Sequence, residues 1–322
     1  MQTNEFANTQ SQTQASAVAN DSAPAIVAAA RRRLSVRHET VYRYQGAASL
    51  GYSLAWLTPR PLPTQDLREH RINVFPKPRF LHESLDAFGN VQHYFEIHKG
   101  HSELRIQSQA IVECAPALDF ALLSAPWESY CPSGITGAAG DPPAWDFIYD
   151  TELAPIAYTY SDYARLAFTP GRPLGEALLA FTAQIYTDFE YVPGATAVDT
   201  PLAEVWEQRA GVCQDFAHLA VSCLRGIGLA TAYVSGYLLT YPNPGETKRI
   251  GADASHAWFA VWAGADIGWV QLDPTNNLIV GDEHIVVALG RDYSDTPPVK
   301  GVCFGGGQHQ LSVGVTVEQL TN

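Results

Sequence analysis

The sequence is poor in charge and contains no long apolar run. Charged residues make up 16% of its 322 residues, against about 25% in an average globular protein, while apolar residues make up 46%. This composition excludes a chain that is disordered throughout, which would combine low hydrophobicity with high charge. It also excludes a coiled coil, which would be rich in Glu, Lys and Arg. No apolar run approaches the roughly 20 residues of a membrane-spanning helix, so we expect no membrane partner.

Positive charge is especially scarce. Lys and Arg number 20 against 33 Asp and Glu, which gives a net charge of −13. The long-range field of such a chain repels phosphate backbones, and the only compact basic run is Arg31–Arg33. We therefore expect no nucleic-acid partner. The composition leaves the oligomeric state open.

Cysteines are few and lie far apart. The five are Cys114, Cys131, Cys213, Cys223 and Cys303. An odd number at low density is not typical of a disulfide framework, and without a Cys-x2-Cys pair we expect no metal site. We expect no organic cofactor, because Gly305–Gly307 is not followed by the Lys of a phosphate-binding loop. The N-terminus lacks the basic start and apolar core of a secretory signal, so the predicted location is cytoplasmic.

The residue pattern divides the chain into four segments. Residues 1–33 are rich in Gln, Thr, Ser, Asn and Ala and are predicted to be a disordered tail. Residues 34–115 contain short alternating runs separated by turns, which is typical of a β-sandwich. Residues 116–170 are interpreted as a linker with short helices, and residues 171–322 as an α+β domain. The expected strands include 34–44, 52–57, 71–74, 91–97, 104–112 and 311–317, and a helix is expected over 176–189.

One cysteine stands at the start of a predicted helix. After Cys213 the apolar residues recur at helical spacing, Gly211 precedes them, and Gly226–Gly228 ends the pattern. The partial positive charge at a helix N-terminus favours a thiolate, and the free N–H groups there can hold an oxyanion. Cys213 is therefore a candidate nucleophile. The alternative is a small buried apolar residue.

Two later segments supply a candidate base and a candidate acid. Residues 254–262 alternate like a buried strand and contain His256 near its start, and residues 268–276 form a second strand that ends near Asp273. The short, glycine-containing link predicts a hairpin, in which His256 and Asp273 would face each other. A helix packed on this sheet could bring Cys213 to His256. Cys213 would then attack an amide carbonyl, His256 would move the proton, and Asp273 would fix the imidazole tautomer.

These segments resemble the bacterial transglutaminase-like superfamily. The motifs are Gly-Val-Cys-x-Asp-Phe-Ala at 211–217, Ser-His-Ala-Trp at 255–258, and Gly-Trp-x-x-Leu-Asp-Pro-Thr-Asn at 268–276. The resemblance implies a papain-like core whose Cys-His-Asp triad maps onto Cys213, His256 and Asp273. It therefore makes 171–322 a transglutaminase-like catalytic domain.

The resemblance extends beyond the core. Residues 38–44, 57–60 and 86–90 resemble the N-terminal β region that accompanies this core in many bacterial members, and residues 290–301 resemble their C-terminal segment. Two positions depart from the pattern. Ala232 and Ala260 stand where related sequences often carry an Arg and a Glu, which would shape the cleft or form a supporting salt bridge.

The predicted function is cysteine-dependent acyl transfer on amide or peptide bonds through a thioester at Cys213. The residues do not distinguish hydrolysis from transfer to a primary amine, so the expected partners are a peptide or protein amide and, for transfer, an amine. Further candidates for substrate-binding or supporting roles are Gln214, Asp215, Tyr237 and Trp258. The alternative function is a non-catalytic scaffold that binds a peptide or glycan. A thiol redox protein is disfavoured, because Cys213 has no Cys-x-x-Cys partner.

Overall fold

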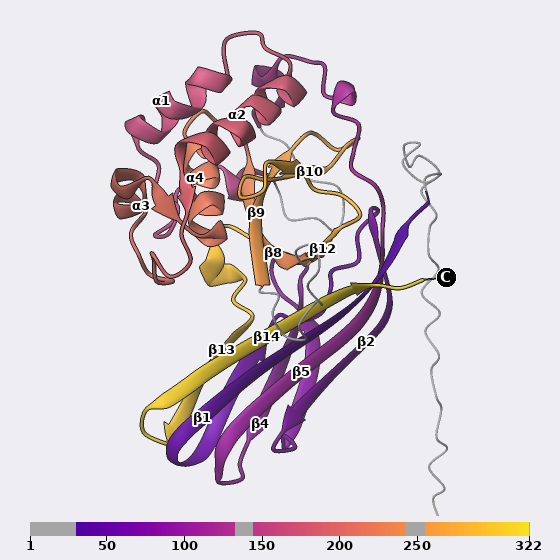
Figure 1. The fold of residues 1–322 in the computed structure, drawn as a ribbon, viewed down its shortest axis with the longest axis vertical. Coiled ribbons are helices and arrows are strands. Elements are labelled where there is room, and N and C mark those ends of the chain that lie inside the picture. The colour runs from indigo at the N-terminus through magenta and orange to yellow at the C-terminus, as the bar shows by residue number, and fades with distance from the viewer. Residues whose placement is uncertain (1–29, 133–143, 242–254, 322) are drawn as a thin grey trace, which may run out of the picture.

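The computed structural model describes residues 30–132, 144–241 and 255–321. It has a curled sheet at one end, the sheet unit, and a helix-covered sheet at the other, the core unit (Figure 1). The sheet unit contains β1 (Arg32–Ala55), β2 (Gln65–Phe75), β3 (Phe80–Leu85), β4 (Val91–Ile97), β5 (His101–Cys114), β13 (Val299–Gly305) and β14 (His309–Gln319). The helices of the core unit are α1 (Tyr158–Ala167), α2 (Leu174–Asp188), α3 (Leu202–Gln208) and α4 (Cys213–Arg225). Its strands are β6 (Glu190–Tyr191), β7 (Ala210–Gly211), β8 (Thr231–Leu238), β9 (Ser255–Trp262), β10 (Trp269–Asp273), β11 (Leu278–Ile279) and β12 (His284–Gly290).

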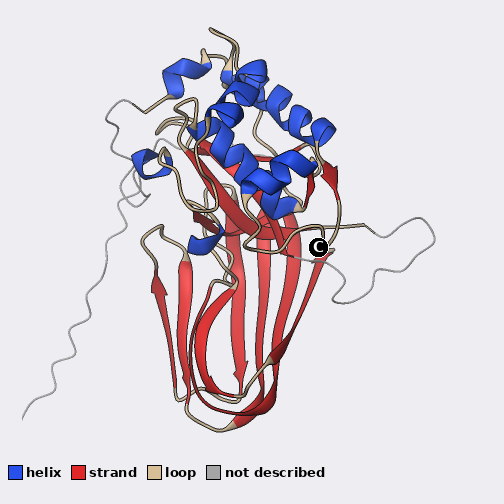
Figure 2. Ribbon diagram, turned by 90° about the vertical axis from the view of Figure 1, so that its left-hand side faces the viewer, coloured by secondary structure: helices blue, strands red, loops and turns tan. Residues whose placement is uncertain are grey.

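The sheet unit is one seven-stranded antiparallel sheet that folds over on itself. The first half of β1 pairs with β5 and β14, and its second half pairs with β4 and β13. Phe95 of β4 and Ile106 of β5 belong to one buried cluster, so the two halves share a core. Figure 2 shows these strands running away from the helices and turning back at the far end. The expected sandwich therefore takes the form of a single curled sheet, and the strands expected at 34–44 and 52–57 are one strand.

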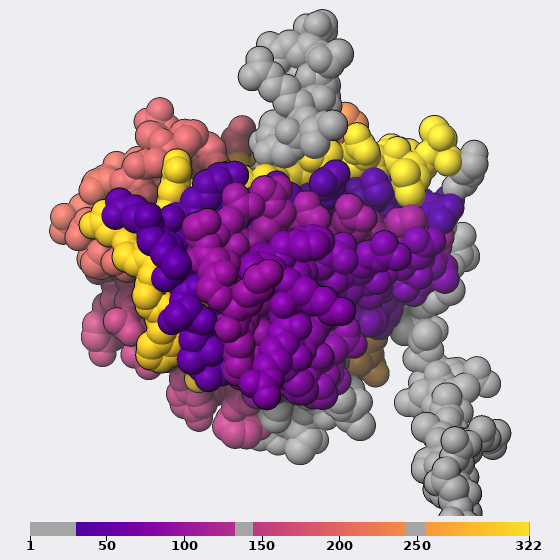
Figure 3. All heavy atoms as spheres, turned by 90° about the horizontal axis from the view of Figure 1, so that it is seen from below, coloured from indigo at the N-terminus to yellow at the C-terminus, as the bar shows by residue number. Residues whose placement is uncertain are grey.

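The C-terminal strands belong to the sheet unit. The strand expected at 311–317 is present as part of β14, which pairs with β1 from Leu34 to Tyr44. Seen from below, C-terminal residues lie beside N-terminal ones (Figure 3). The segment 171–322 is thus shared between both units. Sequence reasoning missed β3 and β13 because nearly all their side chains are exposed and leave no apolar alternation.

The core unit confirms the expected mixture of helix and sheet. The five strands of its larger sheet run in the order β11-β10-β9-β8-β12, and β9 and β10 form the predicted antiparallel hairpin. Helix α4 packs on β8 and β9, with Phe216 and Phe259 in one buried cluster. Helix α1 lies in the segment interpreted as a linker, yet it packs against α4 and belongs to this unit.

Two buried side-chain amides join the sheet unit to β12. Gln65 donates to the carbonyl of Val286 and accepts from its N–H, both at 2.8 Å. Asn90 forms the same pair of bonds with Leu289, also at 2.8 Å. Because β12 is the last strand of its sheet, these amides supply hydrogen-bond partners for backbone groups that have no neighbouring strand on that side.

The motif residues at 57–60 and 86–90 build this junction. Arg60 donates to the carbonyl of Phe88 and, at 2.9 Å, to the side-chain oxygen of Asn90. Asp86 accepts from the N–H of Asn90 at 2.9 Å. Gly89 has a φ of +75°, which favours glycine, and a Cβ there would lie 3.3 Å from Arg60. The turn expected at 86–90 therefore presents Asn90 to β12.

The two departures from the family pattern are direct neighbours. Ala232 of β8 pairs with Ala260 of β9, and both side chains are fully buried. They share a cluster with Phe147, which comes from the short 3-10 helix Ala144–Phe147. A lone charge at either position would be buried in an apolar cluster, which is costly unless the charge is paired.

Candidate active site

Helix α4 presents Cys213 at its first turn. Val212 is extended, with a φ of −120°, and its N–H donates to Oδ2 of Asp215 at 2.8 Å. The same oxygen accepts from the hydroxyl of Thr196 at 2.6 Å. A Cβ at Gly211 would lie 2.7 Å from this oxygen, so the turn requires glycine. Asp215 thus caps the helix and holds the backbone on which half-buried Cys213 is placed.

The hairpin places His256 against Asp273. Nε2 of His256 lies 2.7 Å from Oδ2 of Asp273, whose side chain is fully buried, while 12% of the His256 side chain remains exposed. A carboxylate only accepts hydrogen bonds, so Nε2 carries the proton and Nδ1 is left for the thiol. His256 is hydrogen-bonded to Cys213 on its other side. The structure thus brings together Cys213, His256 and Asp273, the expected nucleophile, its base and the carboxylate expected to orient that base.

Asp273 accepts hydrogen bonds from several further donors. Its Oδ2 accepts from Nδ2 of Asn276 at 2.7 Å and lies 3.3 Å from Nε2 of His284. Its Oδ1 accepts from the backbone N–H of Thr275 at 2.9 Å. The 3.3 Å contact between Nδ2 of Asn276 and Nε2 of His256 joins two donors, so it reflects their convergence on one oxygen and not a hydrogen bond.

These contacts move both titratable groups toward their charged forms. Burial alone would lower the pKa of His256, but the hydrogen bonds to Asp273 and Cys213 outweigh it and raise that pKa to about 10. Burial would raise the pKa of Asp273, but the hydrogen bonds from His256 and His284 hold it well below its usual range. At neutral pH the site therefore holds a His256 imidazolium beside the Asp273 carboxylate.

The other predicted site residues take supporting positions. Gln214 donates to the carbonyl of Val198 at 2.9 Å, next to the loop that Asp215 also holds. Tyr237 is buried at the unit junction, where its hydroxyl lies 2.9 Å from Nδ1 of His38. Trp258 is fully buried and donates to Gln271 at 2.9 Å. Neither aromatic ring presents a surface to solvent, so neither lines an open groove.

Sequence reasoning missed three residues near the cysteine and the carboxylate. Asn276 ends the Asp-Pro-Thr-Asn motif, and its position in that motif could have identified it. His284 reaches Asp273 from a separate strand, β12, and no local pattern marks it. Tyr191 of β6 pairs with Gly211, is 50% exposed, and has its pKa raised by partial burial and by nearby Cys213.

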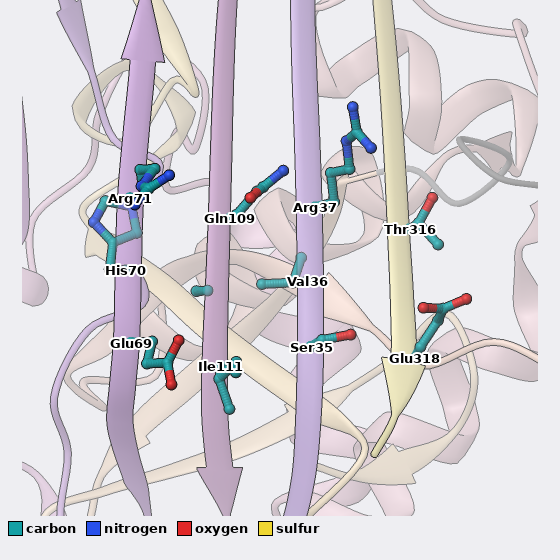
Figure 4. A pocket seen from close by; sticks show the side chains of 11 residues that line it. Ser35, Val36, Arg37, Glu69, His70, Arg71, Gln109, Ile111, Thr316 and Glu318 are labelled. Atoms are coloured by element: carbon teal, nitrogen blue, oxygen red, sulfur yellow. The ribbon is translucent and has the colours of Figure 1, made fainter.

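A large hollow lies away from these residues, on the sheet unit. A cavity of about 600 Å³ crosses β2, β5, β1 and β14 on the sheet unit, and Figure 4 shows Arg71, Gln109 and Arg37 side by side in it. None of its lining residues belongs to the core unit. Among the described residues, no group of three or more His, Cys, Asp and Glu converges as metal ligands. In the same part of the chain, no helix is long and apolar enough to span a membrane.

Comparisons with known proteins bear on both units. The model of the bacterial transglutaminase-like N-terminal region matches residues 34–113, and that of the transglutaminase-like superfamily matches residues 163–274, which include Cys213, His256 and Asp273. Uncharacterized protein Rv2569c of Mycobacterium tuberculosis is 39% identical over 298 residues, covering 90% of this chain and 94% of that protein. The chain belongs to the transglutaminase-like superfamily.

Two further similar proteins extend the comparison. Uncharacterized protein ML0607 of Mycobacterium leprae is 31% identical over 297 residues, covering 89% of this chain and 99% of its own. A crystal structure of a "Putative Cysteine Protease" from Cytophaga hutchinsonii superposes with a TM-score of 0.71 at 19% identity, covering 91% of this chain and 92% of the other. At that identity the likeness confirms the fold, including the combination of core and β region.

Proposed function

We propose that this transglutaminase-like protein is a cysteine hydrolase that cleaves amide bonds in a peptide or protein through a thioester at Cys213. The observation that carries the proposal is the line of contacts from Cys213 to His256 and on to Asp273, with 2.7 Å between the last two. Superfamily membership supports a cysteine-dependent enzyme in general. Hydrolysis of an amide bond is what we propose beyond that general assignment.

The geometry supports a defined sequence of proton transfers. The Cys213 thiolate attacks the carbonyl carbon, and backbone N–H groups at the start of α4 hold the developing oxyanion. The His256 imidazolium then gives its Nδ1 proton to the leaving amine, and the C–N bond breaks to leave a thioester. Water, deprotonated by His256, attacks the thioester carbonyl, which releases the carboxylic acid and restores the cysteine. Asp273 stays ionised and keeps His256 in one orientation.

The openness of the site favours water as the acceptor. Cys213 is half-buried and His256 keeps part of its side chain exposed, so a thioester formed there would be accessible to solvent. Tyr191 stands exposed beside the cysteine and offers an apolar face for the acyl side chain. An amine acceptor would require a site that excludes water in favour of the amine.

The test uses denatured casein with and without a fluorescent primary amine. We expect new amino termini or released ammonia in both reactions, with little amine incorporated, and we expect Cys213→Ala to abolish both products. Cys303→Ala is the matched control, because Cys303 is exposed on β13, outside the core unit. Amine incorporation without hydrolysis would establish a transamidase instead. A Cys213→Ala variant as active as the native protein would refute the mechanism.

A further inference from the structure

We propose that His284 is a positioning residue for the active site: it holds Asp273 from a different strand than His256 and connects it to the sheet unit. The inference rests on the proposed function, because it concerns how the base and its carboxylate are held. Its observation is separate, namely a second histidine on the same carboxylate oxygen. His284 lies 3.3 Å from Oδ2 of Asp273, and 2% of its side chain is exposed.

The protonation of His284 follows from its partner. Asp273 can only accept, so Nε2 of His284 carries a proton and donates it, as Nε2 of His256 does. The two imidazoles approach Oδ2 from different strands, β9 and β12, and the Asn276 amide completes the set. With donors from separate elements on one oxygen, rotation of the carboxylate would break several bonds at once. Asp273 is thereby fixed in the orientation that His256 needs.

The surroundings of His284 indicate that its bond to Asp273 is the main polar contact it makes. Its Nδ1 is buried and has no hydrogen-bond partner among the residues that the structure describes. Trp258 packs edge-on against its ring, with 5.3 Å between ring centroids. An apolar side chain would avoid the cost of a buried, unpaired nitrogen. The hydrogen bond that His284 donates to Asp273 therefore explains why a histidine occupies this position.

The position of β12 connects His284 to the sheet unit. Gln65 forms two hydrogen bonds with the backbone of Val286, which is two residues from His284 on the same strand. Asn90 forms two with the backbone of Leu289, farther along β12. The sheet unit therefore fixes β12, the strand whose His284 contacts Asp273. This gives the N-terminal β region a role at the active site without any contact to substrate.

Removing the donor should change how the site responds to pH. The titratable groups that face Asp273 are His256 and His284, and Cys213 lies beyond His256. Without His284, Asp273 takes up a proton at a higher pH, so the His256 imidazolium loses its counter-charge earlier during acidification. Cys213 should then lose its reactivity at a higher pH than in the native protein. If His284 had a purely structural role, its replacement would not change the pH at which Cys213 loses its reactivity.

The experiment measures iodoacetamide alkylation of Cys213 against pH in the full chain, by peptide mass spectrometry. In His284→Leu we expect the acidic fall in rate to move to higher pH, and in His284→Gln, which restores an N–H donor, we expect it to return toward the native position. With the casein assay, His284→Leu should lower kcat about tenfold or more and leave KM nearly unchanged. His38→Leu is the matched control, because His38 is a buried junction histidine that bonds Tyr237.

The outcomes separate this inference from the proposed function. An unchanged alkylation profile in His284→Leu would overturn the role of His284, and so would an equal shift in His38→Leu, because both would reduce its effect to general packing. Alkylation needs no substrate, so this result stands whatever the casein assay gives. A His256→Ala variant with the native profile would refute the proposed function itself.

Discussion

Removing the Gln65 amide should weaken the junction between the two units by a measurable amount. In Gln65→Met the side chain keeps its volume but loses its bonds to the N–H and carbonyl of Val286, at 2.8 Å each, and to the carbonyl of Arg60, at 2.7 Å. The Val286 carbonyl keeps a second donor, the N–H of Arg60 at 3.0 Å. The substitution therefore leaves the buried N–H of Val286 without its acceptor and removes the two hydrogen bonds that the Gln65 amide donates.

The expected loss combines one unpaired buried group with two lost hydrogen bonds. An unpaired buried N–H costs about 1–3 kcal/mol, and each of the two donated bonds adds about 0.5–1.5 kcal/mol. Gln65 and Val286 also line a cavity of about 70 Å³, which is large enough for water to satisfy part of the lost bonding. We therefore expect the free energy of unfolding to fall by about 2–4 kcal/mol. In a chain of this size that corresponds to a fall in Tm of about 3–6 °C.

The assay is thermal unfolding of the native protein and the variants, followed by circular dichroism. Gln109→Ala is the control, because Gln109 is exposed on the outer face of the sheet unit and should change stability by no more than about 0.5 kcal/mol. Asn90→Ala should resemble Gln65→Met, since it removes the equivalent pair of bonds at Leu289. A Gln65→Met protein that melts within 1 °C of the native one, a difference of roughly 0.7 kcal/mol, would refute the proposed support of β12 by the sheet unit.

Two further predictions concern the helix cap and the buried histidines. Asp215→Ala leaves the Val212 N–H and the Thr196 hydroxyl without their acceptor, so the free energy of unfolding measured in urea should fall by about 2–3 kcal/mol. Cys213 should also be alkylated more slowly. Native values for both measurements would contradict the capping role of Asp215. Burial lowers the pKa of His38 and of His218 to about 4. As pH falls from 6.5 toward 4, the unfolded chain takes up protons that these folded histidines refuse, so each should cost about 3 kcal/mol of stability by pH 4. The fall in Tm between pH 7 and 4.5 should shrink in His38→Gln, and a Tm independent of pH would exclude the effect.

Much of the site could be predicted because its signals are local. Cys213 begins an apolar pattern of helical period directly after glycine, and the structure places it as the first residue of α4. His256 and Asp273 lie on alternating runs joined by a short link, which predicts both the hairpin and the approach of the two side chains. These features depend on residues within one or two neighbouring elements, so the spacing of residues in the sequence is enough to predict them.

The features that sequence reasoning missed depend on contacts between distant segments. His284 reaches Asp273 only because β12 lies in the same sheet as the hairpin. Gln65 and Asn90 bond to backbone atoms about 200 positions away in the sequence. A single side chain that pairs with a strand's backbone leaves no periodic pattern in the sequence. The sequence pattern also divides β1 into two strands, 34–44 and 52–57, because its register with β5 shifts between Arg43 and Ala48.

The most direct test of the account is the pH dependence of Cys213 alkylation in the native protein and in His256→Ala. With the pKa of His256 raised to about 10, its imidazolium stays charged beside the sulfur through neutral pH. Native Cys213 should therefore react rapidly well below pH 8, and more slowly at the same pH in His256→Ala. In that variant the rate should fall about tenfold per pH unit below 8, as for an ordinary thiol. A native Cys213 that is inert, or that follows the ordinary thiol profile with or without His256, would contradict the proposed nucleophile.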